Sequence, residues 1–287
     1  MPPRIAAIHD LSCFGRCALT VVIPTLSVMG YQVVPIPTAL LSTHTGGFED
    51  MHFRDLTADM DAIATHLNGL GVSFRAIYTG FLGSAEQIET VSRFLDLFQA
   101  RPDESRAAPL VLIDPVMGDD GVLYSTYTPE LMRGMKRLAA RARLLTPNLT
   151  EACFLTDTPW RDTAACSAAE ALAFAEALLM RLEGICNGRI VITGIALADG
   201  TLANLGRDLD GSRFCVRLAH EGRSYPGTGD LFASVLLGAL LDGKAFPAAC
   251  EHAARFTAEV IRETAAIDSP ARNGVALEFH LGKLANS

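Results

Sequence analysis

The hydrophobic and polar positions of this chain alternate between short apolar runs and longer segments with a helical period. Six of the runs are bounded by turn residues, and these predict strands. They cover residues 4–8, 32–37, 76–80, 110–114, 143–148 and 189–194. The middle runs are apolar on both faces, which is typical of parallel strands covered by helices on both sides. The pattern therefore predicts a parallel sheet within an α/β fold.

Start signals mark the helices between these strands. Two capping boxes and one N-cap followed by proline indicate three helix starts. They are Ser84 with Gln87, Ser167 with Glu170, and Thr128 before Pro129. The segment behind Ser84 carries one apolar stripe that is expected to face the sheet. The stripe consists of Ile88, Val91, Leu95 and Phe98.

The alternation of apolar runs with helical segments ends after Gly194. Asp199-Gly200 stands between two short apolar runs, which is the signal for a tight hairpin, and residues 213–218 predict a further strand. Two helical segments follow, over residues 230–243 and 246–264. We expect a three-layer α/β/α sandwich whose mostly parallel central sheet has antiparallel edge strands. Residues 101–109 read as an ordinary loop, and no linker interrupts the chain, so one domain over residues 1–287 is predicted.

Composition and charge narrow the function classes. Apolar residues make up 49% and charged residues 20% of the chain, enough for a sizeable core. The net charge of -8 argues against a nucleic-acid-binding surface. The sequence shows no signal-peptide pattern and no apolar run long enough to span a membrane, so a cytoplasmic location is expected. The seven cysteines have no CxxC pair and are interpreted as free thiols.

The stretch "GRSYPGTGDLFASVLLGALLDG", residues 222–243, is the most informative segment. Gly227, Thr228 and Gly229 precede an apolar helix, and a glycine-rich helix N-terminus binds anions through its free N–H groups. Asp230 would repel a phosphate, but a carboxylate there can take a proton from a hydroxyl that attacks phosphorus. The plain alternative is that Asp230 only caps the helix and the glycines only form a loop.

Further polar residues stand at predicted strand ends. Such ends form the usual ligand crevice of open α/β sheets, and carboxylate and amide oxygens suit Mg²⁺. The candidates are Asp114, Asp119, Thr146, Asn148, Glu151, Thr193 and Gly194. Each also has a structural explanation. Asp119 and Asp120 are turn formers, Asn148 is a candidate helix cap, and Thr193-Gly194 could be an ordinary strand exit.

The motifs "PGTGD", "DPVMGD" and "TPNLTEA", in this combination, resemble the ribokinase-like superfamily in its vitamin-kinase branch. "HDLSCFGRCALTVVIPTLSVMG", "LLSTHTGGF" and "YTGFLGS" are similar to pyridoxal/pyridoxamine kinases, which phosphorylate the 5′-hydroxymethyl group of vitamin B6 with MgATP. The resemblance runs from about residue 4 to beyond residue 240. It implies a homodimer and leaves a monovalent cation such as K⁺ open.

The resemblance also implies roles, transferred by motif. Asp230 matches the catalytic base, and Gly227, Thr228 and Gly229 match the anion hole. Asp114 and Glu151 match acidic residues near the metal and the phosphates, while Thr146, Thr193 and Thr228 match positions on the ATP side, together with Asp119 and Asn148. On the vitamin side the matching residues are Thr45 with His44 beside it, and the aromatic Phe81.

A flat pyridine ring needs an apolar slot and a few placed polar groups. Phe81 and Phe14 could supply aromatic faces for the pyridine ring, although Phe14 is more simply expected in the core. Asp10, Ser12 and Thr45 could supply hydrogen bonds. His44 without its motif would be interpreted as an ordinary histidine with satisfied partners.

One departure concerns Asp10, because many pyridoxal kinases carry serine there. A carboxylate would favour a protonated pyridine nitrogen or a charged amine, so we expect pyridoxamine or pyridoxine to react at least as well as pyridoxal.

Other classes of protein fit less well. Hydroxymethylpyrimidine kinases share the fold and mechanism but usually have cysteine at the Asp230 position. A sugar or nucleoside kinase would normally bring a larger lid, and a non-catalytic vitamer- or nucleotide-binding protein would not need the base. A Rossmann dehydrogenase would need GxGxxG after the first strand, where this chain reads "HDLSCFGRC".

Overall fold

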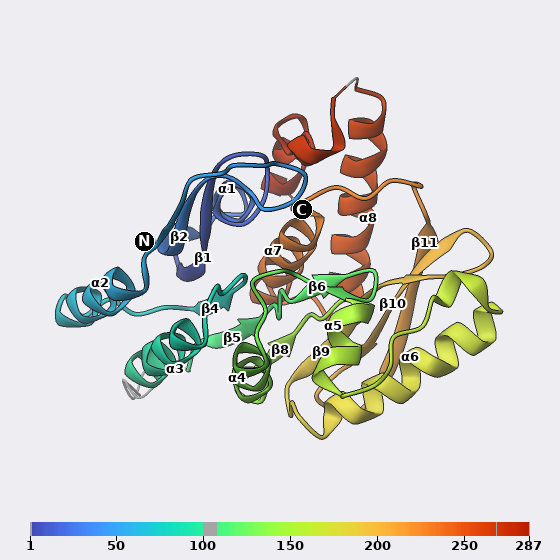
Figure 1. Ribbon diagram of the computed structural model, residues 1–287, viewed down its shortest axis with the longest axis horizontal. Helices are drawn as coiled ribbons and strands as arrows, with labels where there is room; N and C mark the ends of the chain where they lie inside the picture. Colours follow the sequence, from blue (N-terminus) through green and yellow to red (C-terminus); the bar gives the residue numbers. More distant parts are fainter. Residues whose placement is uncertain (1, 100–107, 268, 287) are drawn as a thin grey trace.

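The computed structural model describes residues 2–99, 108–267 and 269–286 (Figure 1). The loop predicted over residues 101–109 lies outside the described residues up to position 107. The strands of the main sheet are β1 (Arg4–Phe14), β2 (Gln32–Thr43), β3 (Phe53–Asp55), β4 (Ala76–Thr79), β5 (Leu110–Ile113), β8 (Leu144–Leu145), β9 (Arg189–Ala196), β10 (Thr201–Arg207) and β11 (Arg213–Ala219). A separate hairpin consists of β6 (Gly118–Asp119) and β7 (Val122–Leu123).

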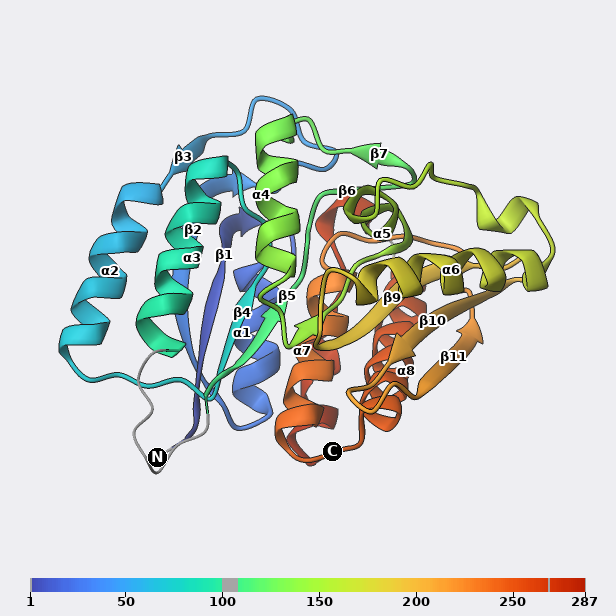
Figure 2. The same ribbon diagram turned by 90° about the horizontal axis from the view of Figure 1, so that it is seen from below.

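The order of the described strands in the main sheet is β11-β10-β9-β8-β5-β4-β1-β2-β3. The six strands from β9 to β2 pair in parallel, and β3, β10 and β11 add antiparallel edges. Figure 2 shows β1–β3 and β9–β11 at opposite ends of the sheet. The predicted fold class is therefore confirmed.

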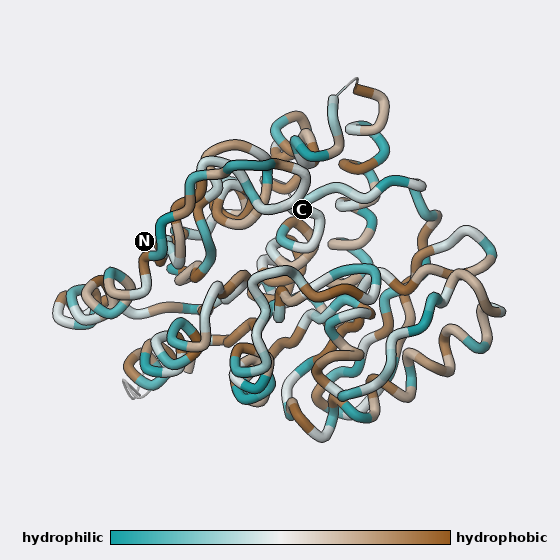
Figure 3. Tube along the Cα trace, in the orientation of Figure 1, coloured by the Kyte–Doolittle hydropathy of each residue, from teal (hydrophilic) through white to brown (hydrophobic). Residues whose placement is uncertain are grey.

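Helices cover both faces of the sheet. One layer contains α2 (Thr57–Gly69), α3 (Ala85–Gln99), α4 (Pro129–Ala139), α5 (Leu149–Leu155) and α6 (Ala168–Glu183). The other contains α1 (Leu19–Val28), α7 (Thr228–Leu241), α8 (Phe246–Ala265) and the 3₁₀ turns η2 (Ala271–Asn273), η3 (Leu277–Phe279) and η4 (Leu281–Asn286). A further 3₁₀ turn, η1 (Thr163–Ala165), precedes α6. Two apolar cores lie between the sheet and these layers, and Figure 3 shows brown, hydrophobic segments along the central strands.

The predicted helix starts are formed by different sets of hydrogen bonds. Ser167 with Glu170 forms a complete capping box, and Thr128 caps α4 with Pro129 in its first turn. Ser84 Oγ accepts the Gln87 N–H, but Gln87 Oε1 accepts from Gly83 N–H rather than from Ser84, so this box is only half formed. The reason is that Gln87 is buried and its Nε2 donates to the carbonyl of Thr38 on β2.

Several elements differ from the sequence prediction. The strand predicted over residues 143–148 has only two residues, because the chain caps α5 at Asn148. The Thr146 N–H and the Pro147 carbonyl still bond to the neighbouring segments, at Ile113 and Thr193. β1 and β2 run well past their predicted ends and pair with each other to Phe14 and Thr43. The helices α1 and α2 and the strands β3, β6 and β7 are additions to the predicted elements, whereas α5 follows the candidate helix cap Asn148. The stripe on α3 is buried as predicted, and the hairpin at Asp199-Gly200 joins β9 to β10.

The described residues contain no helix that is both long and apolar enough to cross a membrane.

Candidate active site

The start of α7 lies beside the loop that follows β1. Gly227 is the N-cap and adopts φ 81, in the left-handed region that favours glycine. A Cβ on Gly227 would lie 2.2 Å from the carbonyl oxygen of Arg16, so the backbones of the two segments touch. The helix behind it buries nine residues, as its apolar sequence predicts. Its N-terminal amides are thus fixed in place at the sheet's carboxyl edge.

Asp230 is held by the backbone of the opposite loop. Its Oδ2 accepts a hydrogen bond of 2.8 Å from the N–H of Ala18, and its side chain is 15% exposed. Burial raises its pKa to about 7, and the nearby charge of Asp10 adds to the increase. The alternative that Asp230 caps α7 is wrong, because Gly227 is the N-cap and the carboxylate bonds across to Ala18 instead.

Ala18 is a site residue that the sequence did not reveal. It is the N-cap of α1 and adopts φ 48, which is uncommon for a residue other than glycine. This conformation turns its N–H towards Asp230. Strained backbone of this kind gathers at functional sites, but no residue type in the sequence signals it.

Asp114 lies directly after β5, where the sequence places it. Its Oδ1 accepts a hydrogen bond of 3.0 Å from Thr146 Oγ1. Burial and then the charge of Asp230 raise the pKa of Asp114 to about 8. The structure therefore brings together three of the predicted residues, Asp114, Thr146 and Asp230.

Glu151 and Asn148 form a capping box at the start of α5. Glu151 Oε2 accepts from the Asn148 N–H (2.7 Å), and its Oε1 accepts from the Met117 N–H (3.1 Å). Asn148 Nδ2 donates to the carbonyl of Gly118. The helix-cap explanation of Asn148 is confirmed. Burial, followed by the charge of Asp114, raises the pKa of Glu151 well above its usual range.

These carboxylates fit a divalent cation. Asp114 and Glu151 are both buried, and the charge of Asp114 is among the causes that raise the pKa of Glu151. A cation between them would relieve this repulsion, and oxygen ligands are what Mg²⁺ prefers. Asp114 is the more available ligand, since backbone N–H groups already occupy both oxygens of Glu151.

Asp119 is exposed on the β6–β7 hairpin, and the next residue, Asp120, adopts φ 48 in its turn. The turn-forming explanation of this pair is confirmed. A cavity of about 340 Å³ opens beside the hairpin. Asp119, Asn148 and Gly194 line it, together with the single tryptophan of the chain, Trp160. Thr193 lies next to this cavity and pairs with Asn148 through a backbone bridge.

The substrate-side residues on β1 are buried. Asp10 accepts a hydrogen bond of 2.9 Å from Ser12 Oγ, and burial raises the pKa of Asp10. The thiol of Cys17, which the sequence did not single out, has its pKa raised by burial and by the charges of Asp10 and Asp230. This part of the structure is therefore lined by acidic and hydrogen-bonding groups close to Asp230.

The remaining substrate-side residues differ in their surroundings. Thr45 is exposed, and Phe81 is half-buried in the loop after β4. His44 is buried with both ring nitrogens bonded: Nδ1 accepts from the Gly46 N–H, and Nε2 lies 2.6 Å from the carbonyl oxygen of Arg272. The interpretation of His44 as a histidine with satisfied partners therefore holds in this structure.

Phe14 is 55% exposed, so its expected core position is wrong. The reason is that the end of β1 extends beyond the other strands and pairs there only with β2. Its ring contacts Phe48 edge to face, at 5.9 Å between centroids. The guanidinium of Arg272 lies over the same Phe48 ring at 5.1 Å. This contact between η2 and the loop after β2 had no signal in the sequence.

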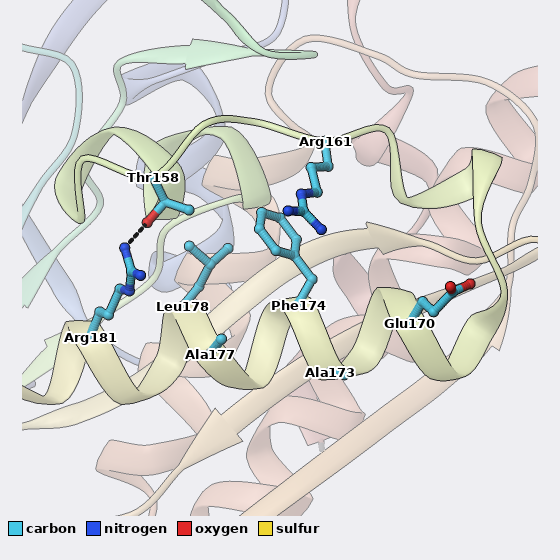
Figure 4. Close-up of a pocket in the computed structure, with 8 residues that line it drawn as sticks. All are labelled: Thr158, Arg161, Glu170, Ala173, Phe174, Ala177, Leu178 and Arg181. Atoms are coloured by element: carbon cyan, nitrogen blue, oxygen red, sulfur yellow. Dashed lines mark hydrogen bonds between the residues drawn. The ribbon is translucent and has the colours of Figure 1, made fainter.

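A second cavity, of about 460 Å³, lies along α6 and contains none of the predicted site residues (Figure 4). Arg161 stands over the ring of Phe174, and Arg181 donates to Thr158 Oγ1, so these side chains already have partners.

Taken together, a parallel sheet with antiparallel edges, a glycine-started helix at its carboxyl edge and a cluster of buried carboxylates define a small-molecule kinase of the ribokinase-like class. The comparisons with known proteins identify the family. Residues 19–274 match the phosphomethylpyrimidine kinase family, and the chain belongs to it.

Similar proteins carry related names. The pyridoxine/pyridoxal/pyridoxamine kinase of Bordetella avium is 29% identical over 280 residues, covering 92% of this chain and 86% of that protein. A Bacteroides thetaiotaomicron structure, provisionally assigned as a phosphomethylpyrimidine kinase and crystallised with pyridoxal, is 38% identical with a TM-score of 0.86, covering 99% and 96% of the two chains. The pyridoxal kinase of Lactobacillus plantarum is 27% identical with a TM-score of 0.87, covering 99% and 97%.

Proposed function

We propose that this protein is an ATP-dependent kinase that transfers a phosphoryl group to the 5′-hydroxymethyl group of a B6 vitamer. One observation carries the proposal. The carboxylate of Asp230 is fixed by the Ala18 N–H at the N-terminus of α7, and its pKa is raised to about 7. A base with a pKa close to the working pH suits proton transfer from an alcohol. The names of the similar kinases, and the pyridoxal in one related crystal, support the choice of vitamer.

In the proposed reaction, Asp230 accepts the hydroxyl proton while the oxygen forms its bond to the γ-phosphorus of ATP. The bond from that phosphorus to the bridging oxygen breaks, and ADP leaves with the electron pair. The amides of residues 227–229 donate to the phosphoryl oxygens as charge develops on them. Asp114 and Glu151 would hold Mg²⁺, which neutralises phosphate charge when bound. Thr146, Asn148, Thr193 and Thr228 would contact the nucleotide, with Asp119 at its edge.

The residues proposed to bind the vitamer are inferred from the motif resemblance and from the burial of β1. Asp10 and Ser12 would bond polar groups of the pyridine, with Thr45 and Phe81 at the entrance. His44 would act by holding the loop after β2 against Arg272. The proposal also includes a single domain and a homodimer. Light scattering of the purified protein measures whether it is a homodimer.

Replacing the base tests the proposed function. We expect Asp230→Asn to lower kcat about 10²-fold or more, with little change in KM for ATP, because the amide cannot accept the proton. Initial rates would be measured with ATP, Mg²⁺ and each of pyridoxal, pyridoxamine and pyridoxine, and with hydroxymethylpyrimidine as the rival substrate.

Asp59→Asn is the matched control, since Asp59 is exposed in the first turn of α2 and should retain native activity. Full activity of Asp230→Asn in a folded protein would refute its role as the base. A preference for hydroxymethylpyrimidine over all three vitamers would instead transfer the assignment to the rival substrate.

A further inference from the structure

A fully buried histidine lies behind the proposed base. His9 is on β1 and is 0% exposed. Neither of its ring nitrogens has a hydrogen-bond partner within the part of the chain that the structure describes. Buried polar groups are usually hydrogen-bonded, so an unpartnered histidine in a core needs an explanation. No sequence pattern indicates a role for this residue, although it directly precedes Asp10.

The ring of His9 faces Asp230. Its Nδ1 lies 3.8 Å from Asp230 Oδ1. This separation is longer than a hydrogen bond, and a small side-chain adjustment closes it. The other carboxylate oxygen, Oδ2, already accepts from the Ala18 N–H. The two donors therefore approach different oxygens of the same carboxylate, and each oxygen keeps a second lone pair for a substrate proton.

The surrounding residues fix the ring in this orientation. Tyr78 on β4 contacts it edge to face, with centroids 4.4 Å apart. Gly80 follows β4, and a Cβ at that position would lie 2.2 Å from His9 Nδ1. Only glycine at position 80 leaves room for the ring. The pairing of β1 with β2 is also irregular between His9 and Leu11, and such irregularities re-aim side chains next to active sites.

We propose that His9 is a positioning residue for Asp230, whose neutral ring donates a hydrogen bond from Nδ1 to Oδ1 when the carboxylate is ionised. This inference rests on the proposed function of Asp230 as the base. Burial lowers the pKa of His9 to about 3, which is consistent with a ring that stays uncharged. A neutral donor orients the carboxylate without adding a permanent positive charge beside it. An imidazolium in its place would make Asp230 a weaker base.

Two substitutions distinguish positioning from packing. His9→Phe keeps the size of the ring but has no donor. His9→Asn is smaller but places an N–H close to the position of Nδ1. For a positioning role, we expect His9→Phe to lower kcat about tenfold or more, with KM for ATP and vitamer within about twofold, and His9→Asn to recover most of the loss. For a packing role the order reverses, because Asn leaves a void that Phe fills. A lower kcat for His9→Asn than for His9→Phe, or a native kcat for His9→Phe, would overturn the inference.

A measurement on the native protein covers the case in which His9→Phe does not fold. The ¹⁵N chemical shifts of the His9 side chain, assigned by their loss in His9→Asn, report which nitrogen carries the proton. A proton on Nδ1 supports the inference, and a proton on Nε2 alone overturns it.

The two proposals can fail separately. If the native protein phosphorylates a vitamer and Asp230→Asn is inactive while His9→Phe is normal, only the role of His9 is lost. If the native protein has no kinase activity, the proposed function fails, while the tautomer still decides whether His9 faces Asp230 as a donor.

Discussion

Asp10 is the residue on which the proposed choice among vitamers depends. The residue is 6% exposed, and its carboxylate accepts a hydrogen bond from Ser12 Oγ and acts electrostatically on Asp230. A buried carboxylate is costly to ionise without a partner, and a cationic group on the substrate supplies that partner. The vitamers differ here, since pyridoxamine carries an amine where pyridoxal carries an aldehyde.

We expect Asp10→Ser to lower kcat/KM for pyridoxamine relative to pyridoxal, because the variant loses the negative charge that favours a cation. The measurement compares kcat/KM for the three vitamers in the native and variant enzymes. Ser12→Ala is a useful comparison, as it removes the hydrogen bond to Asp10 but keeps the carboxyl group. An unchanged order of preference in Asp10→Ser would rule out this role.

Among the elements, α7 contributes most to the proposed site. The conformation and contacts of its first residues explain why glycine stands at its start. Gly227 combines φ 81 with a close approach to the Arg16 carbonyl, while Thr228 Oγ1 donates to the carbonyl of Tyr225. Glycine is therefore favoured at position 227 for two separate reasons, the backbone conformation and the close contact with the Arg16 carbonyl. The other end of α7 offers a comparison. Gly243 has φ 90, but a Cβ at that position would have open space around it, with none of the described residues within 4 Å.

Gly227→Ala is expected to reduce the free energy of unfolding by about 2–4 kcal/mol and to abolish most activity, because strain and overpacking add. Gly243→Ala carries only the conformational cost, about 1–2 kcal/mol, and should keep native kcat. Urea denaturation and initial rates measure both effects. Equal losses in the two variants would mean that the contact with Arg16 has no influence.

At the scale of the whole molecule, the sheet gathers carboxylates that are far apart in sequence. Asp114 follows β5 and Asp230 lies on α7, and their pKa values are raised to about 8 and about 7. The ordinary pKa of an aspartate is 3.8, close to its pKa in an unfolded chain. The folded state therefore binds more protons than the unfolded state between about pH 4 and pH 8. Stability from these groups falls as the pH rises through that window.

We expect Asp114→Asn to be more stable than the native protein at pH 8, because the amide removes a buried charge. The difference should vanish near pH 4, where Asp114 is protonated in the folded state and half protonated in the unfolded chain. Thermal unfolding at the two pH values measures this difference. Each kcal/mol added to the free energy of unfolding should raise Tm by roughly 2–4 °C. A variant less stable than the native protein at pH 8 would contradict the raised pKa of Asp114.

The sequence determined the layers, because apolar runs with a strand or helix period have few ways to be buried. It located the parallel strands, the hairpin at Asp199-Gly200 and the apolar helix behind Gly227. It also placed Asp114, Thr146 and Thr193 near a common edge, since parallel strands end on one side of a sheet.

The contacts between distant segments depend on the fold of the whole chain. Ala18 N–H on Asp230, His9 beside it, and His44 on the Arg272 carbonyl all join parts of the chain that no local pattern connects. The exposed Phe14 and the hydrogen bond from the Met117 N–H to Glu151 belong to the same group. Periodicity reports which face of an element is buried, whereas these contacts depend on how whole elements pack, which the pattern within one element does not encode.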